Sequence, residues 1–301
     1  MIMLFKIVDA FAERLFGGNA AGVVIIMEGE SFPTNDIMLK VAAELRYSET
    51  AFVKLLGDNR FKIRFFTPVA EVELCGHATI GAFHALLEEG MVERDSVYEV
   101  ETLQGVLGVE VKENGSILMD MAKPQLYEYI KDKDAVDELY SIMGLQRADG
   151  HGVCNVNPQL YLHPRIVSTG LRDIMLPVAN EEELYKVAPD FAALAELSKR
   201  YNVVGVHAFT CNSKDGRVHA RNFAPLYGID EEAATGTSNG ALACYLFDYG
   251  IVAGNQTVNV IQGEKMGRPS LISAQILLRG GELSVKVGGR AVTLAGGNIN
   301  L

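Results

Sequence analysis

Glu49, His77 and the adjacent pair Glu231–Glu232 are the side chains of this sequence best suited to move a proton. Glu49 lies between a helix-like segment and a strand-like run, and His77 lies within a turn that contains glycine. The positive end of a helix disfavours protonated imidazole, so we expect His77 to be a neutral proton partner near pH 7. A lone glutamate is usually a solvated surface group, and adjacent glutamates before a turn usually cap it. Chemistry therefore requires these groups to meet in one site.

Two glycine-containing turns could hold a small anion beside such groups. The turns are Cys75–Gly81 and Ala234–Gly240, and each leads into an apolar helix that ends at a glycine. A helix N-terminus offers unpaired backbone N–H groups, so each turn is a candidate cradle for a carboxylate. For either turn alone, tight packing of a helix start is the simpler explanation. Because small-molecule sites favour domain interfaces, we expect the active site in a cleft between two halves that each supply one turn.

One known catalytic motif fits the second turn by letter but not by context. Gly236–Gly240 matches the G-x-S-x-G elbow of α/β-hydrolases, yet Asp230–Ala233 precedes it where a hydrophobic strand is required. The last histidine of the chain is His219, so no catalytic histidine follows the serine. The sequence also contains no G-x-G-x-x-G and no G-x-x-x-x-G-K-[ST]. Hydrolase, Rossmann and P-loop sites are therefore not supported.

An internal repeat organises the chain. When residues 51–68 are aligned without gaps with residues 208–225, 157 positions later, seven of eighteen positions match. The first-copy members are Ala51, Phe52, Asp58, Arg60, Arg64, Phe66 and Pro68. Both copies then lead through a glycine turn into an apolar helix. We therefore expect two equivalent halves, residues 1–126 and 127–301, with the last strand able to return to the first half.

Short strand-like runs separated by turn residues dominate the first half, and helical periodicity is limited to a few segments. The strand-like runs are 4–8, 23–27, 52–55, 61–66, 97–102, 106–111 and 117–121. The helical segments are 35–46, 135–143 and 181–200, the last interrupted by Pro189. This mixture predicts an α+β fold rather than a doubly wound sheet.

Bulk composition excludes several classes of partner. The formal net charge of −11, with no run of basic residues, disfavours nucleic acid and anionic lipid. No apolar run approaches the roughly 18–20 residues of a membrane helix, and the first residues lack the layout of a signal peptide. The four cysteines are far apart and form no CxxC pair, so zinc-site spacing is absent. We expect a reduced cytoplasmic protein without a metal.

Taken together, these motifs resemble the PhzF-like (phenazine biosynthesis) isomerase family over nearly the whole chain. The matching stretches, in the family's order, are Asp9–Phe11, Gly18–Ala21, Ser48–Val53, Arg64–Pro68, Cys75–Gly81, Glu232–Gly236 and Gly267–Ser270. The resemblance implies the diaminopimelate-epimerase-like fold, in which each half is a sheet rolled around a central apolar helix. It further implies a homodimer, no cofactor and a small-molecule carboxylate substrate.

The resemblance also implies roles for individual residues. In phenazine-pathway members a glutamate matching Glu49 moves a proton along a dihydro-hydroxyanthranilate ring, assisted by residues matching His77 and Glu232. The residues that it implies for substrate binding are Asn19, Ser48, Gly76, Thr79, Gly236, Thr237 and Ser238. Three positions depart from the usual pattern: Glu232 replaces an aspartate, Thr237 replaces the serine of the phenazine enzyme, and Ala20 replaces a proline.

These observations predict an isomerase in which Glu49 removes a proton from one carbon of a small carboxylic acid and returns it elsewhere. To perform both tasks near neutrality, Glu49 should be partly buried in a closed cleft. A cysteine-assisted racemase or epimerase is an alternative, with Cys75 in one half, although the matching position holds Thr235. A non-catalytic small-molecule or partner-binding protein on the same fold is another. Specificity is expected from the segments 153–159 and 262–268.

Overall fold

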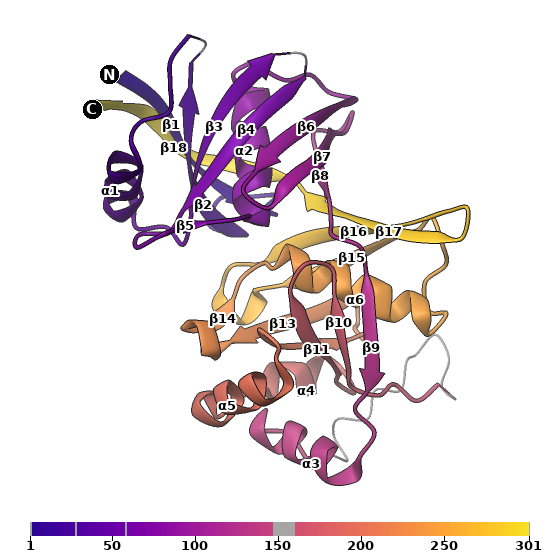
Figure 1. Cartoon of the computed structure of the whole chain (residues 1–301). Coiled ribbons are helices and arrows are strands. Elements are labelled where there is room, and N and C mark those ends of the chain that lie inside the picture. Colours follow the sequence, from indigo (N-terminus) through magenta and orange to yellow (C-terminus); the bar gives the residue numbers. More distant parts are fainter. Residues whose placement is uncertain (1, 28, 58, 147–159, 301) are drawn as a thin grey trace. The chain divides into compact units, whose positions relative to one another are not determined.

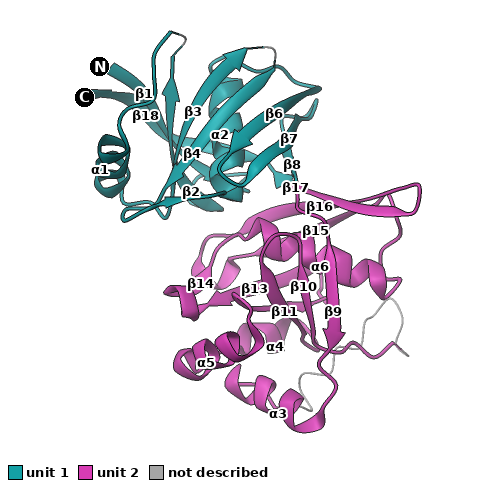
Figure 2. Cartoon of the chain, in the orientation of Figure 1, with its two compact units in different colours: residues 1–120, 288–301 teal, residues 121–287 magenta. Residues whose placement is uncertain are grey.

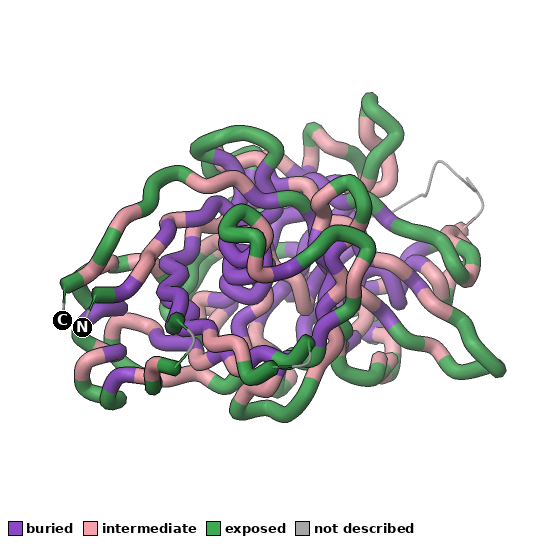
Figure 3. Tube along the Cα trace, turned by 90° about the horizontal axis from the view of Figure 1, so that it is seen from above, coloured by how far each residue is buried: buried purple, intermediate pink, exposed green. Residues whose placement is uncertain are grey.

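The chain folds into two compact units in the computed structural model, which describes residues 2–27, 29–57, 59–146 and 160–300 (Figure 1). Unit 1 consists of residues 1–120 and 288–301, and unit 2 consists of residues 121–287 (Figure 2). Both ends of the chain belong to unit 1, where the last strand pairs antiparallel with the first. Exposed residues gather in loops and strand ends, as the green stretches of Figure 3 show.

Unit 1 is a sheet rolled around one buried helix, α2. Its neighbouring strands follow the order β18-β1-β2-β3-β4-β6-β7-β8, with β5 added to β4, and the β2–β3 and β4–β6 pairs are parallel. Helix α2 contacts both β18 and β8, the two ends of this row, which requires the sheet to curve around it. The elements are β1 (Ile2–Ala10), β2 (Asn19–Ile26), α1 (Asn35–Leu45), β3 (Thr50–Gly57), β4 (Arg60–Phe66), β5 (Glu71–Val72), α2 (Gly76–Glu88), β6 (Ser96–Thr102), β7 (Gly105–Val111), β8 (Ile117–Asp120) and β18 (Ala291–Asn300).

The composition of α2 explains why it can occupy this position. Small and apolar residues surround its axis, and nearly every residue from His77 to Leu86 is buried. The ring of Phe83 packs edge-on against Phe61 of β4, with ring centroids 5.4 Å apart. A close approach of β2 and β3 needs Gly22, because a Cβ there would lie 2.8 Å from Thr50 Oγ1.

Unit 2 repeats this plan around α6 and adds a layer of helices. Its strands follow the order β9-β10-β11-β12-β13-β15-β16, with β14 added to β13, and the β11–β12 and β13–β15 pairs are parallel. The elements are β9 (Gln125–Tyr129), α3 (Lys133–Ile142), β10 (Arg165–Ser168), β11 (Arg172–Pro177), α4 (Glu181–Lys186), α5 (Phe191–Tyr201), β12 (Gly205–Thr210), β13 (Val218–Ala224), η1 (Pro225–Tyr227), β14 (Ile229–Glu232), α6 (Gly236–Asp248), β15 (Thr257–Gln262), η2 (Glu264–Met266), β16 (Ser270–Arg279) and β17 (Glu282–Gly289).

Helices α3, α4 and α5 share a second hydrophobic core with the strands of unit 2. Leu139 of α3, Leu184 of α4 and Leu194 of α5 pack with Ile174 of β11 and Val206 of β12. The predicted helix over 181–200 is divided into α4 and α5 around Pro189, as the missing N–H of proline requires. In the part of the chain that the structure describes, no helix is long and apolar enough to cross a bilayer.

The predicted α+β fold with two pseudo-symmetric halves is confirmed. The order strand, parallel strand, antiparallel strand, short strand, buried helix, strand occurs twice, as β2-β3-β4-β5-α2-β6 and as β11-β12-β13-β14-α6-β15. The two buried helices begin at Gly76 and Gly236, within the glycine-containing segments that were expected to precede them. These segments form the first helical turn of α2 and of α6.

Candidate active site

The parallel pairing of β2 and β3 brings four of the predicted site residues of unit 1 to one edge. Gly22 lies opposite Thr50, and Gly22 N donates a hydrogen bond to Glu49 O at 3.2 Å. Parallel strands start at the same edge of a sheet, so Asn19 at the start of β2 lies near Ser48 and Glu49, which precede β3. Helix α2 begins at this same edge and presents His77 to all three side chains.

His77 is the centre of this group, which we call the His77 cluster (Asn19, Ser48, Glu49, Cys75 and His77). Asn19 Nδ2 donates to His77 Nδ1 at 3.3 Å, and Cys75 Sγ lies 3.4 Å from the same nitrogen. On the other side of the ring, Nε2 lies 3.2 Å from Glu49 Oε2 and 3.3 Å from Ser48 Oγ. An amide nitrogen can only donate, so Nδ1 accepts and the neutral ring carries its proton on Nε2. His77 therefore donates a hydrogen bond from Nε2 to Ser48 Oγ, and the Glu49 carboxylate lies in electrostatic contact with the same nitrogen.

Burial determines the protonation state of this imidazole. The His77 side chain is 6% exposed, and its withdrawal from water lowers its pKa below the ordinary value of 6.5, an effect that the charge of Glu49 partly offsets. His77 is thus neutral at pH 7. The Glu49 side chain is 22% exposed, which places its carboxylate at the boundary between protein and solvent. This combination suits a carboxylate that must reach a substrate while one of its oxygens is held in place.

The N-terminus of α2 is left open by the protein's own side chains. Its N-cap, Cys75, makes no side-chain capping hydrogen bond, and the same is true of Thr235 at the start of α6. The other α-helices in the described ranges all carry such a bond, from the N-caps Thr34, Asp132, Asn180 and Asp190. Because the first N–H groups of a helix have no partner within it, the two buried helices are the ones suited to bind an anion.

Gly76 and Thr79, both predicted to bind substrate, differ in how the structure uses them. A Cβ on Gly76 would have only ordinary contact, with Met119 Sδ at 3.7 Å, so packing within the protein does not explain a glycine there. The space is available to a ligand. Thr79 is fully buried and directs both of its donors to Cys75 O, from its backbone N at 3.0 Å and its Oγ1 at 2.8 Å. Its hydroxyl therefore stabilises the first turn of α2.

The predicted residues of unit 2 surround the start of α6. Glu232, at the end of β14, accepts a hydrogen bond from Thr235 Oγ1 at 2.8 Å. Gln262 supports the same turn by donating from Nε2 to Glu232 O at 2.7 Å and accepting from Thr235 N at 3.3 Å. Gly236 and Thr237 are half-buried at the start of the helix, and Thr237 O accepts from Thr169 Oγ1 at 2.9 Å.

Ser238 lies in a buried polar group that the sequence analysis did not anticipate, the Asp173 cluster (Asp173, His207, Asn222 and Ser238). Ser238 Oγ donates to Asp173 Oδ2 at 2.6 Å and accepts from Asn222 Nδ2 at 3.1 Å. Asn222 Nδ2 also lies 3.2 Å from His207 Nδ1. Burial raises the pKa of Asp173 to about 6 and lowers the pKa of His207 to about 3. The sequence feature that could have indicated this cluster is His207, a histidine within the apolar strand that follows Gly205.

A repeated ion pair fixes the short strand that leads into each turn. Arg64 donates from Nε and Nη2 to Glu71 of β5 at 2.7 and 2.6 Å. Arg221 donates in the same way to Glu231 of β14, at 2.8 Å for both bonds. Each guanidinium also lies over the phenylalanine two residues later, 5.2 Å from Phe66 in unit 1, and the same arrangement recurs in unit 2. This device explains the repeated Arg-x-Phe motif.

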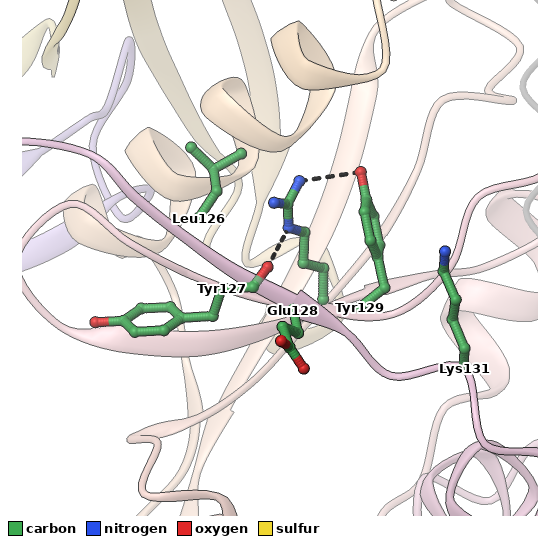
Figure 4. A pocket seen from close by; sticks show the side chains of 6 residues that line it. Leu126, Tyr127, Glu128, Tyr129 and Lys131 are labelled. Atoms are coloured by element: carbon green, nitrogen blue, oxygen red, sulfur yellow. Dashed lines mark hydrogen bonds between the residues drawn. The ribbon is translucent and has the colours of Figure 1, made fainter.

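Neither a surface hollow at β9 nor the described segment 262–268 contains a further candidate catalytic group. The hollow is lined by Leu126–Tyr129, Lys131 and Arg165, and Arg165 donates to Tyr127 O and to the hydroxyl of Tyr129 (Figure 4). None of the predicted site residues lines it. Segment 262–268 forms η2, where Glu264 Oε2 lies 2.8 Å from His219 Nδ1. Segment 153–159, which includes Cys154, lies outside the described residues.

Residues 8–297 match the family described as phenazine biosynthesis-like protein, PhzC-PhzF. The chain belongs to the PhzC-PhzF family. An uncharacterized isomerase of Clostridium acetobutylicum is 34% identical over 95% of this chain and 94% of its own length. The trans-2,3-dihydro-3-hydroxyanthranilate isomerase of Pseudomonas fluorescens is 29% identical, with 99% of each chain covered. The crystal structure of a Bacillus anthracis PhzF-family protein superposes with a TM-score of 0.84 at 26% identity over both full chains. Members of the PhzC-PhzF family are isomerases, which confirms the predicted class of enzyme.

Proposed function

We propose that this chain is a cofactor-independent isomerase that shifts a proton on a small carboxylic acid, with Glu49 as general acid and base. The observation that carries the proposal is the contact between Glu49 Oε2 and the buried, neutral imidazole of His77, at 3.2 Å, beside the open N-terminus of α2. The name of the Pseudomonas fluorescens relative, a hydroxyanthranilate isomerase, supports an unsaturated carboxylic acid as substrate.

The substrate carboxylate would accept hydrogen bonds from the N–H groups of Gly76, His77 and Ala78, the first residues of α2. Its negative charge is favoured there by the helix dipole, at about 0.3–1 kcal/mol when exposed and more when buried. Binding at this point would bring the α-carbon region toward Glu49. The fixed geometry replaces a random encounter and lowers the entropic part of the barrier.

Proton transfer then needs one carboxylate and no electron acceptor. The C–H bond of the substrate breaks, its electron pair stays on the substrate as a delocalised carbanion, and an O–H bond forms on Glu49. The partly exposed Glu49 exchanges this proton with solvent and delivers a proton to another carbon, or to the other face of the same carbon, so that one proton is returned for each one removed and the electron pair stays on the substrate. The neutral ring of His77, whose Nε2 lies 3.2 Å from Glu49 Oε2, would place its N–H dipole beside the carboxylate during both transfers.

We also propose that Glu232, Gly236 and Thr237 of unit 2 assist the same reaction. The supporting observation is that the start of α6, like that of α2, lacks a side-chain cap, and that Glu232 is held by Thr235. A longer acid than the usual aspartate, and a threonine in place of serine, would alter which substrate is accepted rather than the transfer itself.

A cysteine-assisted epimerase is the second candidate, because Cys75 Sγ lies 3.4 Å from His77 Nδ1, within reach of an imidazole that could accept its proton. A two-base mechanism needs an opposing acid, and the corresponding residue is Thr235, whose hydroxyl donates to Glu232. This favours Glu49 over Cys75 as the proton carrier.

Proton NMR in heavy water tests the proposal directly. Trans-2,3-dihydro-3-hydroxyanthranilate and a panel of unsaturated and α-acidic carboxylic acids would be incubated with wild type, Glu49→Gln and Glu44→Gln, with a chelator present. Glu44 is exposed near the end of α1 and provides the same chemical change outside the site. Deuterium should enter a carbon position with wild type and Glu44→Gln, and about 10²–10⁴-fold more slowly with Glu49→Gln. Equal incorporation by Glu49→Gln would contradict the proposal.

A further inference from the structure

Three side chains of the His77 cluster are metal ligands of different chemical kinds. Glu49 offers a carboxylate, Cys75 a thiolate and His77 an imidazole, and one ligand atom from each lies within 4.8 Å of the other two. His77 Nε2 lies 3.2 Å from Glu49 Oε2 and 3.8 Å from Cys75 Sγ. The sequence analysis did not predict this group, because Glu49 is distant from Cys75 and His77 along the chain and no CxxC pair marks a zinc site.

These distances fit a four-coordinate zinc ion. With Zn–N and Zn–O bonds of about 2.0–2.2 Å and a Zn–S bond of about 2.3 Å, neighbouring ligand atoms in a tetrahedron are roughly 3.3–3.6 Å apart. The two measured separations bracket that range, so small rotations of side chains would complete the geometry. Three protein ligands leave the fourth position open, toward the partly exposed face of Glu49.

Charge balance also favours a divalent ion at this position. A thiolate and a carboxylate together neutralise Zn²⁺, so the occupied site carries no net charge, and burying it avoids the cost of an unpaired ion. The positive end of α2 disfavours a cation, but it stabilises the thiolate of a cysteine at the helix N-terminus, which is the form that binds metal. Cys75 and His77 are both buried, which shields the bonds from water.

We propose that Glu49, Cys75 and His77 bind Zn²⁺ or a similar borderline-soft divalent ion, and that the bound ion inhibits the enzyme. Inhibition, unlike binding, rests on the proposed function, because it follows from occupation of the Glu49 carboxylate. The ion would compete with substrate for Glu49. It takes no part in the proposed proton transfer.

Metal binding requires the His77 proton to move to the other nitrogen. Zinc needs a bare Nε2, so Nδ1 must carry the proton and find an acceptor. The residue that faces Nδ1 is Asn19, whose amide would turn to present Oδ1 in place of Nδ2. A carboxylate at position 19 would accept that proton better, as in the carboxylate–histidine–zinc arrangement of many sites. Asn19→Asp should therefore bind the metal more tightly than wild type.

Titration of the reduced, metal-free protein with cobalt(II) tests the site without any substrate. We expect one Co²⁺ per chain, displaced by Zn²⁺, with the near-ultraviolet absorption of a thiolate–cobalt bond. Cys75→Ser should lose this absorption, and Cys211→Ser, which changes a cysteine outside the site, should keep it. Glu49→Gln should weaken binding about tenfold or more, and Asn19→Asp should strengthen it about tenfold.

Several results would overturn the proposal. They are no thiolate absorption in wild type, its survival in Cys75→Ser, or its loss in Cys211→Ser. If Cys75→Ser fails to fold, unchanged cobalt affinity in Glu49→Gln is equally decisive, because Glu49 is partly exposed and its replacement is isosteric. Unimpaired deuterium exchange with saturating zinc would overturn inhibition alone. Exchange is otherwise measured with a chelator present, so failure of the isomerase proposal and failure of metal binding are separate results.

Discussion

The starts of α2 and α6 are built on the same scaffold but place their polar groups in opposite ways. Each follows an arginine–glutamate pair and a short strand, and each lacks a side-chain N-cap. At α2, the polar groups converge on His77, next to the partly exposed Glu49. At α6, Ser238 turns into the interior and joins the Asp173 cluster. One scaffold thus supports a partly exposed carboxylate beside an imidazole in unit 1 and a buried polar network in unit 2.

The repeat shows where the difference arises. With the shift of 157, His207 and Asn222 correspond to Thr50 and Phe65. The third residue of the helix is Ser238 in α6 and Ala78 in α2. At these equivalent positions, unit 1 has apolar or small residues and unit 2 has polar ones. The polar groups around His77 lie at the edge of the sheet, whereas the Asp173 cluster of unit 2 is buried.

The largest expected difference in stability lies between the two ion pairs. Arg221 is 7% exposed and also donates to Leu184 O and Val187 O, so Arg221→Met removes the donors of Glu231 and Val187 O and one of the two donors of Leu184 O. This substitution should lower the free energy of unfolding by about 3–5 kcal/mol. Arg64 is 18% exposed, and Arg64→Met should lower the free energy of unfolding by about 1.5–3 kcal/mol. Urea unfolding of both variants measures this, and a larger loss for Arg64→Met would show that the two pairs are not ranked by burial.

Asp173 should make the stability of unit 2 fall as the pH rises through about 6. Its folded pKa, about 6, lies above the ordinary 3.8, so the folded state favours the protonated carboxyl. The contribution of Asp173 to the free energy of unfolding is fully present below about pH 4. It is lost as the pH rises through about 6. Relative to wild type, Asp173→Asn should therefore gain about 3 kcal/mol between pH 4 and pH 7.5. Unfolding curves at the two pH values measure the gain, with exposed Asp230→Asn as the control. A constant difference between variant and wild type would contradict the protonated carboxyl.

His77 should act as a positioning residue whose loss affects turnover more than binding. His77→Gln should lower kcat about 10²-fold, because Glu49 loses the neutral imidazole beside its Oε2, while KM changes little. Burial lowers the pKa of His77, so wild type should keep the neutral ring down to below pH 6.5 and lose activity as the ring protonates. That limb of the pH–rate profile should be missing in His77→Gln. An identical limb in both enzymes would assign it to another group.

Cys75 should show the smallest catalytic effect. If Glu49 carries the proton, Cys75→Ser should change kcat/KM by no more than about threefold, since the hydroxyl can replace the contact with His77. A thiol-based epimerase would lose at least about 10²-fold with the same substitution. Steady-state kinetics of Cys75→Ser and Cys211→Ser side by side distinguish these outcomes.

Much of this architecture was predictable from local patterns. The repeat identified Arg64 and Arg221, Pro189 marked the break between α4 and α5, and the motif order identified Asn19, Ser48, Glu49 and His77, which the structure brings together. These signals succeed because each depends on neighbouring residues or on direct comparison of two segments.

The remaining features depend on contacts between distant residues. Glu231 was named with Glu232 as a candidate for proton transfer, but it pairs with Arg221 of a different strand, and Glu71 pairs with Arg64 in the same way. Asp173 and Asn222 looked like ordinary polar positions because only the packed sheet beneath α6 buries them. Thr79 looked like a ligand-binding hydroxyl, although it bonds back to Cys75 O once the helix starts at Gly76. Burial and tertiary hydrogen bonds are not encoded in spacing alone.

The most direct test of the account compares solvent deuterium exchange in Glu49→Gln and Glu232→Gln on one accepted substrate. If unit 1 supplies the proton carrier, Glu49→Gln should reduce exchange about 10²–10⁴-fold, while Glu232→Gln keeps measurable exchange with a changed KM. Exchange at the wild-type rate in Glu49→Gln, with loss in Glu232→Gln, would contradict the account and place the proton carrier in unit 2.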